Sequence, residues 1–492
     1  NLILFKLKNM SKSLIKNILS NLYLLTVVLG GLVFFTYVLK KGDIYRSQDK
    51  CEKKLINKIS CKTSESVDLV YRELSNIRYL LPGRRLEYIS GLEEYKNEPI
   101  GFNFNYQKNL NNVNGFLLLS KHDPENLKPA IELWNLNSQE KVHSWNINYD
   151  ELTMDMSEPD KQKLRLKHPV LLNDGSIITI ATNENAPVLK YDMCGVLQSK
   201  NQDHWYHHSV EVDKEGLVYI PVNHAKSKSL FYDNYRDFKG KRIYGEEVFY
   251  RDQAIAILDK DLKLKKVIPL DQIFYSIGLL HDVNSPFIKN WHDPYHLNDI
   301  HPFTNNSGDK ILYLSMRSYG LISFNQSKNK VEWVMRGIAD RQHDITPIPN
   351  KVNSVSIFDN GVKKNTPLGN FRGNSLIEIE FPKTKTTKYY LGRNLFEQGL
   401  SKKRIYFDNL PKNLIPNTTT QGRGRFLNSG NIFIEATNQG KMFEYNPKNK
   451  KILWSYLNKA QSGKIFMLSW SRYYDELPEG LEINKFKSCK KN

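Results

Sequence analysis

A chain of 492 residues exceeds the size at which one compact hydrophobic core usually stops growing, so two or three ordinary domains or one ring of repeats are expected. Hydrophobic residues make up 40% and aromatic residues 12% of the sequence, which excludes disorder for most of the chain and favours strands. The net charge of +19 comes from lysines spread over the whole length, a distribution that argues against nucleic-acid binding and is compatible with an anionic substrate.

The first predicted element is an apolar segment, Leu22–Leu39, which carries no charge over 18 residues. As a helix it would be about 27 Å long, close to the thickness of the hydrocarbon layer. No small-residue cleavage signature follows it, so we expect an uncleaved anchor rather than a removed signal peptide. Residues 1–42 are therefore predicted to form a cytoplasmic tail and a transmembrane anchor in the inner membrane. The rest of the chain is then expected in the periplasm, an orientation that the flanking lysines do not favour.

Residues 43–110 are predicted to form a helical stalk or linker, because apolar residues recur at helical spacing between Val67 and Leu80 within a highly charged run. The four cysteines of the chain show neither a CxxC pair nor the spacing of a zinc site. Pairing of Cys51 with Cys61 and free thiols are both compatible with this pattern, so the redox compartment stays open. The four positions are Cys51, Cys61, Cys194 and Cys489.

Residues 111–492 consist of short apolar runs separated by turns rich in Gly, Asn and Asp. Six units begin near residues 114, 167, 207, 296, 342 and 421. Such units fit an all-β fold, a six-bladed β-propeller, in which each blade buries its faces against its neighbours. Insertions near residues 222–253 and 382–418 explain the uneven spacing and are expected as loops on one rim. Trp145, Trp333 and Trp454 recur at equivalent blade positions and are predicted to pack between blades.

Nine of the twelve histidines lie between His204 and His343, and several of them open successive units. His207 and His208 open the third unit, His296 the fourth, and His343 lies at the start of the fifth. The first strand of every blade lines the central channel of a propeller, so these residues are expected to converge on the axis. Strand alternation would send only one of the paired histidines inward. The remaining histidines of this region are interpreted as structural; they include His204, His281, His292 and His301.

Several motifs resemble those of the bacterial arylsulfate sulfotransferase (arylsulfotransferase, ASST) family. They are "YHHSVEVDKEGLVYIP" in the third unit, "DPYHLNDIHPF" and "LYLSMRSYGLISFN" in the fourth, and "RQHDITPIP" and "SIFDNG" in the fifth. The resemblance covers roughly residues 114–456. It implies a PAPS-independent sulfotransferase, which moves a sulfuryl group from an aryl sulfate to a phenolic or other hydroxyl acceptor. The family reaction is ping-pong and passes through a sulfohistidine.

By this resemblance His343 takes the position of the nucleophile, and Arg317 that of the sulfate-binding arginine. His296 and Asn298 match the family's His-x-Asn element, and His207 or His208 matches its remaining active-site histidine. The chemistry agrees, because a neutral imidazole is a good nucleophile at pH 7 and a covalent intermediate divides one difficult transfer into two easier steps. A guanidinium offers a permanently charged planar fork to the sulfuryl oxygens.

Supporting roles are less well defined by the sequence. Asp344 or Asp299 could orient an imidazole, and "FDNG" (residues 358–361) is interpreted as a tight turn with glycine at positive φ. The family also uses a lysine in the last blade, for which no equivalent stands out here; Arg423 or Arg425 would substitute for it. The family's separate N-terminal β-domain has too little chain here between residues 79 and 112.

Two other functions use the same residues. A hydrolase would let water resolve the sulfohistidine, and a non-catalytic propeller would bind a partner or an anionic polymer. Clustered histidines could also hold a divalent metal, but an arginine in the cluster would repel a cation, so no metal or cofactor is expected. The expected partners are small-molecule donor and acceptor, and the membrane through Leu22–Leu39. The natural substrates and the oligomeric state are not indicated.

Overall fold

The computed structural model describes most of the chain from residue 95 onwards. The described residues are 95–106, 113–153, 164–182, 187–223, 253–279, 295–317, 319–361, 373–381, 388–391, 400–407, 409–418 and 420–489. The chain divides into two compact units, and the first, residues 1–84 with 230–249, lies outside these ranges. The second unit consists of residues 85–229 and 250–492.

The predicted membrane anchor, Leu22–Leu39, and most of the predicted stalk lie outside the described residues. Within the ranges that are described, no helix combines the length and the apolar character needed to cross a bilayer. The span, its orientation and the periplasmic location therefore stay predictions.

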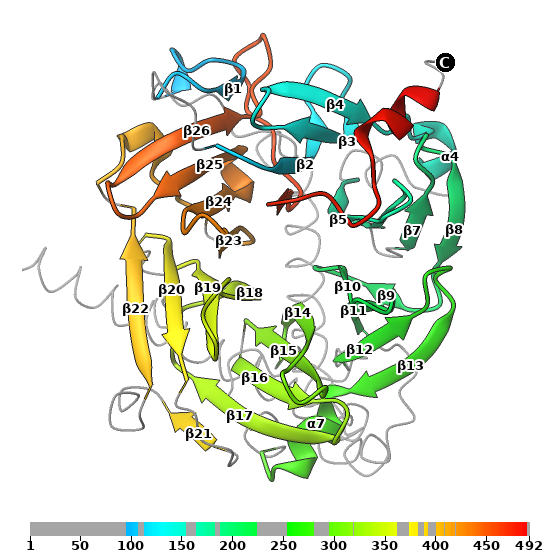
Figure 1. Ribbon diagram of the computed structural model, residues 1–492, viewed down its shortest axis with the longest axis vertical. Coiled ribbons are helices and arrows are strands. Elements are labelled where there is room, and N and C mark those ends of the chain that lie inside the picture. Colours follow the sequence, from blue (N-terminus) through cyan, green and yellow to red (C-terminus); the bar gives the residue numbers. More distant parts are fainter. Residues whose placement is uncertain are drawn as a thin grey trace, which may run out of the picture. The chain divides into compact units, whose positions relative to one another are not determined.

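Six sheets follow one another around a common centre and form the predicted six-bladed β-propeller (Figure 1). The first blade contains β27 (Arg472–Tyr474), β2 (Phe116–Asp123), β3 (Lys128–Asn135) and β4 (Glu140–Ser144). The second contains β5 (Leu166–Leu171), β6 (Ile177–Ala181), β7 (Val188–Tyr191) and β8 (Leu197–Asn201). The third contains β10 (Glu211–Val212), β11 (Val218–Asn223), β12 (Gln253–Leu258) and β13 (Leu264–Pro269), with β9 (Trp205–Tyr206) also paired to β11.

The other three blades follow the same plan. The fourth contains β14 (Leu297–Thr304), β15 (Lys310–Met316), β16 (Gly320–Asn325) and β17 (Lys330–Arg336), with β21 (Lys388–Leu391) added in parallel. The fifth contains β18 (His343–Pro347), β19 (Ser354–Asp359), β20 (Ser375–Glu380) and β22 (Ser401–Tyr406). The sixth contains β23 (Arg423–Phe426), β24 (Ile432–Ala436), β25 (Lys441–Asn446), β26 (Lys451–Leu457) and β1 (Gly101–Asn103).

The first blade closes the ring, because its innermost strand comes from the other end of the propeller sequence. Strand β27 pairs antiparallel with β2, with Arg472 opposite Leu118 and Tyr474 opposite Phe116. The sequence predicted a first unit built from residues 114–145 alone, and the origin of its inner strand was not foreseen. A three-residue strand has too few positions to show an alternating pattern.

The hydrophobic core lies between neighbouring blades. Strands near the centre, such as β6, β11 and β19, are buried along their whole length because blades cover both of their faces. Outer strands such as β4 are half-exposed. Trp145, Trp333 and Trp454 are buried in three of the inter-blade clusters, as predicted.

Two segments of the rim differ from the expected loops and linker. Residues 382–418 were predicted as an insertion, yet they include β22, the outer strand of the fifth blade, and β21. Strand β22 has the sequence SKKRIY, and its exposure along one blade edge explains why it looks like a charged loop. Residues 101–103 fall in the predicted helical linker and form β1, which pairs with β26.

Short helices complete the second unit. They are α4 (Tyr149–Thr153), α7 (Leu270–Ser276), and the 3-10 helices η5 (Lys412–Leu414), η6 (Thr437–Gln439) and η7 (Ile483–Ser488). Helix η7 packs on the first and second blades, where Phe486 stacks on His143 with ring centroids 4.4 Å apart. A disulfide between Cys194 and Cys489 ties the end of η7 to the second blade.

Candidate active site

The backbone adopts an uncommon conformation near the start of each innermost strand. A non-glycine residue with positive φ lies within three residues of the start of each one: Trp470 (φ 62°), His168 (φ 51°), His208 (φ 62°), His296 (φ 48°), Arg341 (φ 61°) and Gln421 (φ 61°). Such residues are uncommon and persist only where the surrounding structure holds them. The ladders of β5, β14 and β18 also shift register near this point, which re-aims side chains.

Three of the predicted histidines come together there from successive blades. The ring centroid of His208 lies 5.1 Å from that of His296 and 6.3 Å from that of His343. His208 is thus the member of the pair that faces the other two imidazoles, and its Nδ1 lies 2.6 Å from Nδ1 of His207. Trp470 closes the group, 5.9 Å from His343 and 6.3 Å from His208.

We call this group, with Lys167, the histidine layer; it consists of Lys167, His208, His296, His343 and Trp470. Lys167 comes from β5, and its Nζ lies 4.6 Å from the centroid of the Trp470 ring. The indole N–H of Trp470 is buried and has no hydrogen-bond acceptor among the described residues. The layer therefore presents a cation and a free donor beside three imidazoles.

The hydrogen bonds of Asn360 determine the tautomer of His343. The amide nitrogen of Asn360 donates to the carbonyl oxygens of Thr418 (2.9 Å) and Gln421 (2.7 Å), which fixes the direction of the amide. Its oxygen then lies 2.6 Å from Nδ1 of His343 and accepts a proton from it. The lone pair of His343 is consequently on Nε2, to which no described residue is hydrogen-bonded.

Burial keeps the imidazoles of His208 and His343 neutral. It lowers the pKa of His343 well below the ordinary value, a hydrogen bond to Asn360 opposes this, and the charge of Arg317 adds to the decrease. Burial likewise lowers the pKa of His208, helped by the charge of Lys167. A neutral, buried imidazole with a free Nε2 is suited to nucleophilic attack.

Asn298 and Arg317 stand beside the histidine layer. Asn298 is fully buried and donates from Nδ2 to the carbonyl of Gln342 (2.7 Å), next to His343. The backbone N–H of Arg317 donates to the carbonyl of His296 (2.9 Å), so the end of β15 is fixed to the entry of β14. Arg317 also lines a cavity of about 150 Å³ between the fourth and fifth blades, with apolar walls that include Tyr319 and Ile338.

Next to the histidine layer along the same inner strands lies a second group, which we call the ionic layer. It takes one residue from each blade: Arg472, His168, Glu211, Asp299, Asp344 and Arg423. Arg472 binds Glu211 through two bonds of 2.8 and 3.1 Å, and Arg423 binds Asp344 at 3.1 Å. Both guanidiniums also approach Nε2 of His168, at 3.0 and 2.6 Å.

The ionic layer corrects three sequence-based suggestions. Asp344 does not orient His343, because its carboxylate accepts from Arg423 and from the N–H of Gly424 (3.0 Å). Asp299 accepts from the N–H of Ile345 (2.9 Å) instead of an imidazole. Arg423 is buried in an ion pair with Asp344, and Arg425 approaches Asp475 at 3.5 Å, so neither arginine is placed to substitute for the family's last-blade lysine.

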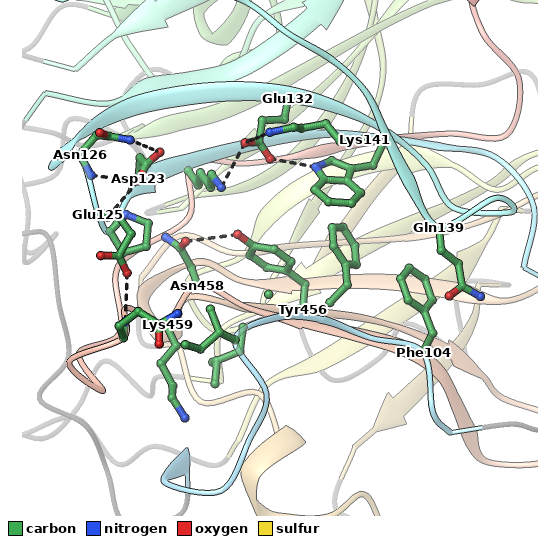
Figure 2. Close-up of a pocket in the computed structure, with 18 residues that line it drawn as sticks. Phe104, Asp123, Glu125, Asn126, Glu132, Gln139, Lys141, Tyr456, Asn458 and Lys459 are labelled. Atoms are coloured by element: carbon green, nitrogen blue, oxygen red, sulfur yellow. Dashed lines mark hydrogen bonds and ion pairs between the residues drawn. The ribbon is translucent and has the colours of Figure 1, made fainter.

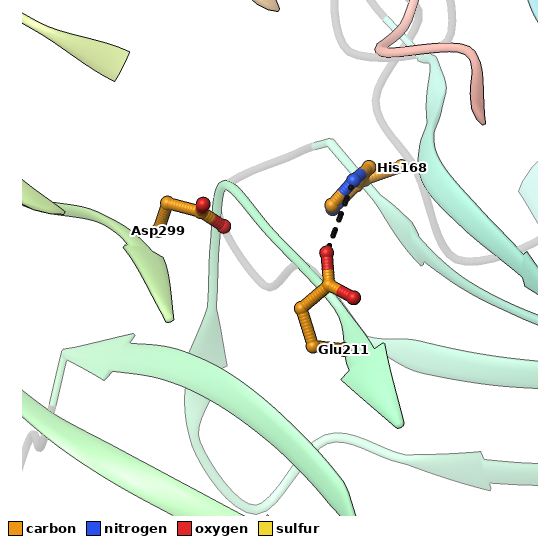
Figure 3. Close-up of side chains that lie close together, drawn as sticks. All are labelled: His168, Glu211 and Asp299. Carbon is orange, nitrogen blue, oxygen red and sulfur yellow. Dashed lines mark ion pairs between the residues drawn. The ribbon is translucent and has the colours of Figure 1, made fainter. Parts of the chain in front are cut away.

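A metal would fit this layer poorly. His168, Glu211 and Asp299, which lie close together in Figure 3, bring one potential ligand atom each within 4.8 Å of the others. Both oxygens of Glu211 are, however, already bound by Arg472, and two guanidiniums face the imidazole. A cation would have to displace both arginines, so these residues form an ion-pair network and do not fit a metal centre.

Another cavity, of about 620 Å³, lies between the first and sixth blades (Figure 2). Aromatic rings of Phe102, Trp134 and Tyr456 line it, and its carboxylate Glu132 is engaged by the indole N–H of Trp134 at 2.9 Å and by Lys141 at 3.4 Å. None of the predicted site residues lines this cavity.

Sequence reasoning missed Asn360, Trp470 and Lys167. "FDNG" does form a turn with Gly361 at φ 67°, as predicted, but its asparagine also orients His343. Lys167 stands directly before His168 at the entry of β5, as His343 stands before Asp344 at the entry of β18. An alignment of blade against blade would have drawn attention to that lysine.

Comparisons with known proteins give one family. Residues 168–459 match the family described as Arylsulfotransferase (ASST). No curated protein matches the chain significantly. Two similar solved structures are "Structure of Dos1 propeller" (9% identity, TM-score 0.33, 73% of this chain and 74% of that chain) and the Cps50 (Swd1) β-propeller domain of Myceliophteria thermophila (7%, 0.36, 73% and 97%). Likeness at these TM-scores carries no argument. The family match spans more than half of the sequence and includes the inner strands from β10 to β23, and so the chain belongs to the arylsulfotransferase family.

Proposed function

We propose that the protein transfers a sulfuryl group from an aryl sulfate to a phenolic or other hydroxyl acceptor, with His343 as the nucleophile. The observation that carries this proposal is the tautomer of His343, whose Nδ1 proton is held by Asn360 while Nε2 is left open. Membership of the arylsulfotransferase family implies a sulfotransferase-type enzyme with small-molecule substrates. The open Nε2 is the reason for assigning His343, among the three histidines, as the nucleophile.

In the first step, Nε2 of His343 attacks the sulfur and the bond from sulfur to the phenolic oxygen breaks. The imidazole becomes a sulfoimidazolium, and its Nδ1 proton stays hydrogen-bonded to Asn360. In the second step, the acceptor oxygen attacks the same sulfur and the S–N bond breaks, which regenerates the neutral imidazole. Two transfers at one nucleophile make the reaction ping-pong.

Arg317, His208 and His296 are assigned to the sulfuryl oxygens. Arg317 provides the permanent charge, and its field already reaches His343, as the lowered pKa of that imidazole indicates. The imidazoles of His208 and His296 can each donate an N–H to the sulfuryl group. The cavity of about 150 Å³ beside Arg317, partly lined by apolar side chains, offers space for an aromatic ring, which favours aryl sulfates as donors.

The test is turnover of 4-nitrophenyl sulfate by the purified chain, with and without a phenolic acceptor. We expect nitrophenolate to accumulate continuously only when the acceptor is present, in equal amount with the sulfated acceptor, and to stop at about one equivalent per protein without it. The His343→Asn variant should lose turnover by about 10⁴-fold or more. His143→Asn is the matched control, because His143 stacks on Phe486 at the outer strand β4 and should leave the rate unchanged.

Two outcomes would contradict the proposal, and each would favour a different function. Release of nitrophenolate at the same rate without acceptor would identify a hydrolase that uses the same histidine. An absence of turnover in the wild type, with every aryl sulfate tried, would favour the non-catalytic propeller.

We also propose that the propeller works outside the reducing cytoplasm, as the expected periplasmic location requires. The disulfide between Cys194 and Cys489 supports this, because such bonds persist mainly in oxidising compartments.

A further inference from the structure

Lys167 differs from the other buried lysines of the described residues. Lys441 donates to Asn413 O, Ile415 O and the hydroxyl of Tyr95, and Lys459 donates to three carbonyl oxygens. Lys167 is 5% exposed, yet within the described ranges its ammonium has neither a carboxylate nor a hydrogen-bond acceptor. A buried, unpaired cation is unfavourable for folding, so we infer that Lys167 is present to interact with a ligand.

Lys167 and the nucleophile His343 both contact the ring of Trp470. The Nζ of Lys167 lies 4.6 Å from the centre of the Trp470 ring, and His343 contacts that ring at 5.9 Å between centroids. The charge of Lys167 also contributes to the low pKa of both His208 and His343. Glu435, whose charge raises the pKa of Lys167, already accepts from the backbone N–H groups of Trp470 and Ser471.

Resting on the proposed function, we propose that Lys167 exchanges a proton with the phenolic oxygen in both half-reactions. As the S–O bond of the donor breaks, the ammonium of Lys167 gives a proton to the departing phenolate and becomes a neutral amine. As the acceptor oxygen attacks the sulfohistidine, the amine takes the proton of the acceptor hydroxyl. One proton thus moves out with the first phenol and returns from the second, so the cycle needs no proton from water.

The surroundings of Lys167 favour proton transfer over the alternative role of a permanently charged group that only binds the sulfuryl oxygens. Burial lowers the pKa of Lys167 well below its ordinary value, and the nearby charge of Arg165 adds to this. A general acid and base works best when its pKa is close to the working pH. Arg317 can hold the sulfuryl charge without exchanging any proton, which leaves proton transfer to the lysine.

The experiment compares Lys167→Met and Lys167→Arg on two donors with the same acceptor. Phenyl sulfate releases a basic phenolate that needs a proton, whereas 4-nitrophenyl sulfate releases one that does not. We expect Lys167→Met to lower kcat/KM for phenyl sulfate by about 100-fold or more and for 4-nitrophenyl sulfate by less than about tenfold. Lys167→Arg should lose as much activity on phenyl sulfate as Lys167→Met does, because arginine keeps the charge but cannot release a proton.

Other results would overturn the inference. Recovery of phenyl sulfate turnover in Lys167→Arg would mean that charge alone is needed. Equal losses on both donors would mean that Lys167 does not protonate the leaving group. Thermal unfolding distinguishes a catalytic role of Lys167 from a structural one. Removing an unpaired buried ammonium should leave the Tm of Lys167→Met equal to or higher than that of the wild type. A lower Tm together with equal losses of activity on both donors would make the lysine structural.

The proposed function can fail separately. If wild-type protein forms no sulfo-adduct with 4-nitrophenyl sulfate, the assignment of His343 is wrong and so is the role of Lys167. If the adduct forms in the wild type and in Lys167→Met, and the two donors respond alike to the substitution, only the inference about Lys167 is wrong.

Discussion

The histidine layer and the ionic layer come from the same inner strands, often from adjacent residues. His343 precedes Asp344, and Lys167 precedes His168. In the ionic layer, arginines and carboxylates bind one another across the blades. In the histidine layer, the Nε2 of His343 and the ammonium of Lys167 have no partner among the described residues. The difference indicates that one layer holds the ring together and that the other is left open for a ligand.

The strongest test of the ionic layer is Arg423→Met. This change leaves the buried carboxylate of Asp344 without its ion-pair partner and should destabilise the protein by about 3–5 kcal/mol. Urea unfolding followed by tryptophan fluorescence measures the effect. Arg425→Met, two residues along β23, is the control; Arg425 is 24% exposed and its loss should change stability by less than about 1 kcal/mol. Equal effects of the two substitutions would contradict a special role for the layer.

The histidine layer is tested next by Asn360→Asp. A carboxylate beside Nδ1 would stabilise the imidazolium, so the pKa of His343 should rise from its low value in the wild type. Because protonation of Nε2 removes the nucleophile, activity is lost as pH falls, and the acid limb of kcat/KM should move to higher pH in the variant. Aspartate cannot donate to Thr418 and Gln421, so the rate will fall for a structural reason too. The pH profile is therefore the decisive measurement, and a profile that superimposes on that of the wild type would show that Asn360 does not contact His343 during turnover.

A further test of the ionic layer is the effect of Asp299→Asn on the pH dependence of stability. Burial, Asp344 and Glu211 raise the pKa of Asp299 to about 8, whereas an unfolded aspartate has a pKa of about 3.9. Between these values only the unfolded chain loses the proton, so the contribution of Asp299 to stability falls as pH rises from about 4 to about 8. Asparagine does not ionise, so the variant should gain stability relative to the wild type across that window. A difference that stays constant with pH would mean that Asp299 is ionised in the folded protein.

The sequence predicted the six blades and the convergence of His208, His296 and His343, because blade-periodic motifs define both. It did not decide between His207 and His208. That choice depends on the left-handed backbone at His208, and no side-chain pattern reports such a conformation in advance. Strand β27 and its neighbour Trp470 were missed because they complete a blade that begins some 350 residues earlier, at β2.

Lys167 and Asn360 were missed for other reasons. A lysine in a lysine-rich sequence is most often a solvated surface residue, and only its burial distinguishes this one. An asparagine before glycine is typical of a turn, and the turn exists; its contact with His343 is a tertiary one, about 17 positions away in the chain.

The most direct measurement is the intact mass of the protein after brief exposure to 4-nitrophenyl sulfate without acceptor, followed by peptide mapping. The account predicts a gain of one sulfuryl group on His343, lost when phenol is added and absent from His343→Asn. A stable gain on another residue, or release of nitrophenolate with no adduct in the wild type, would contradict it.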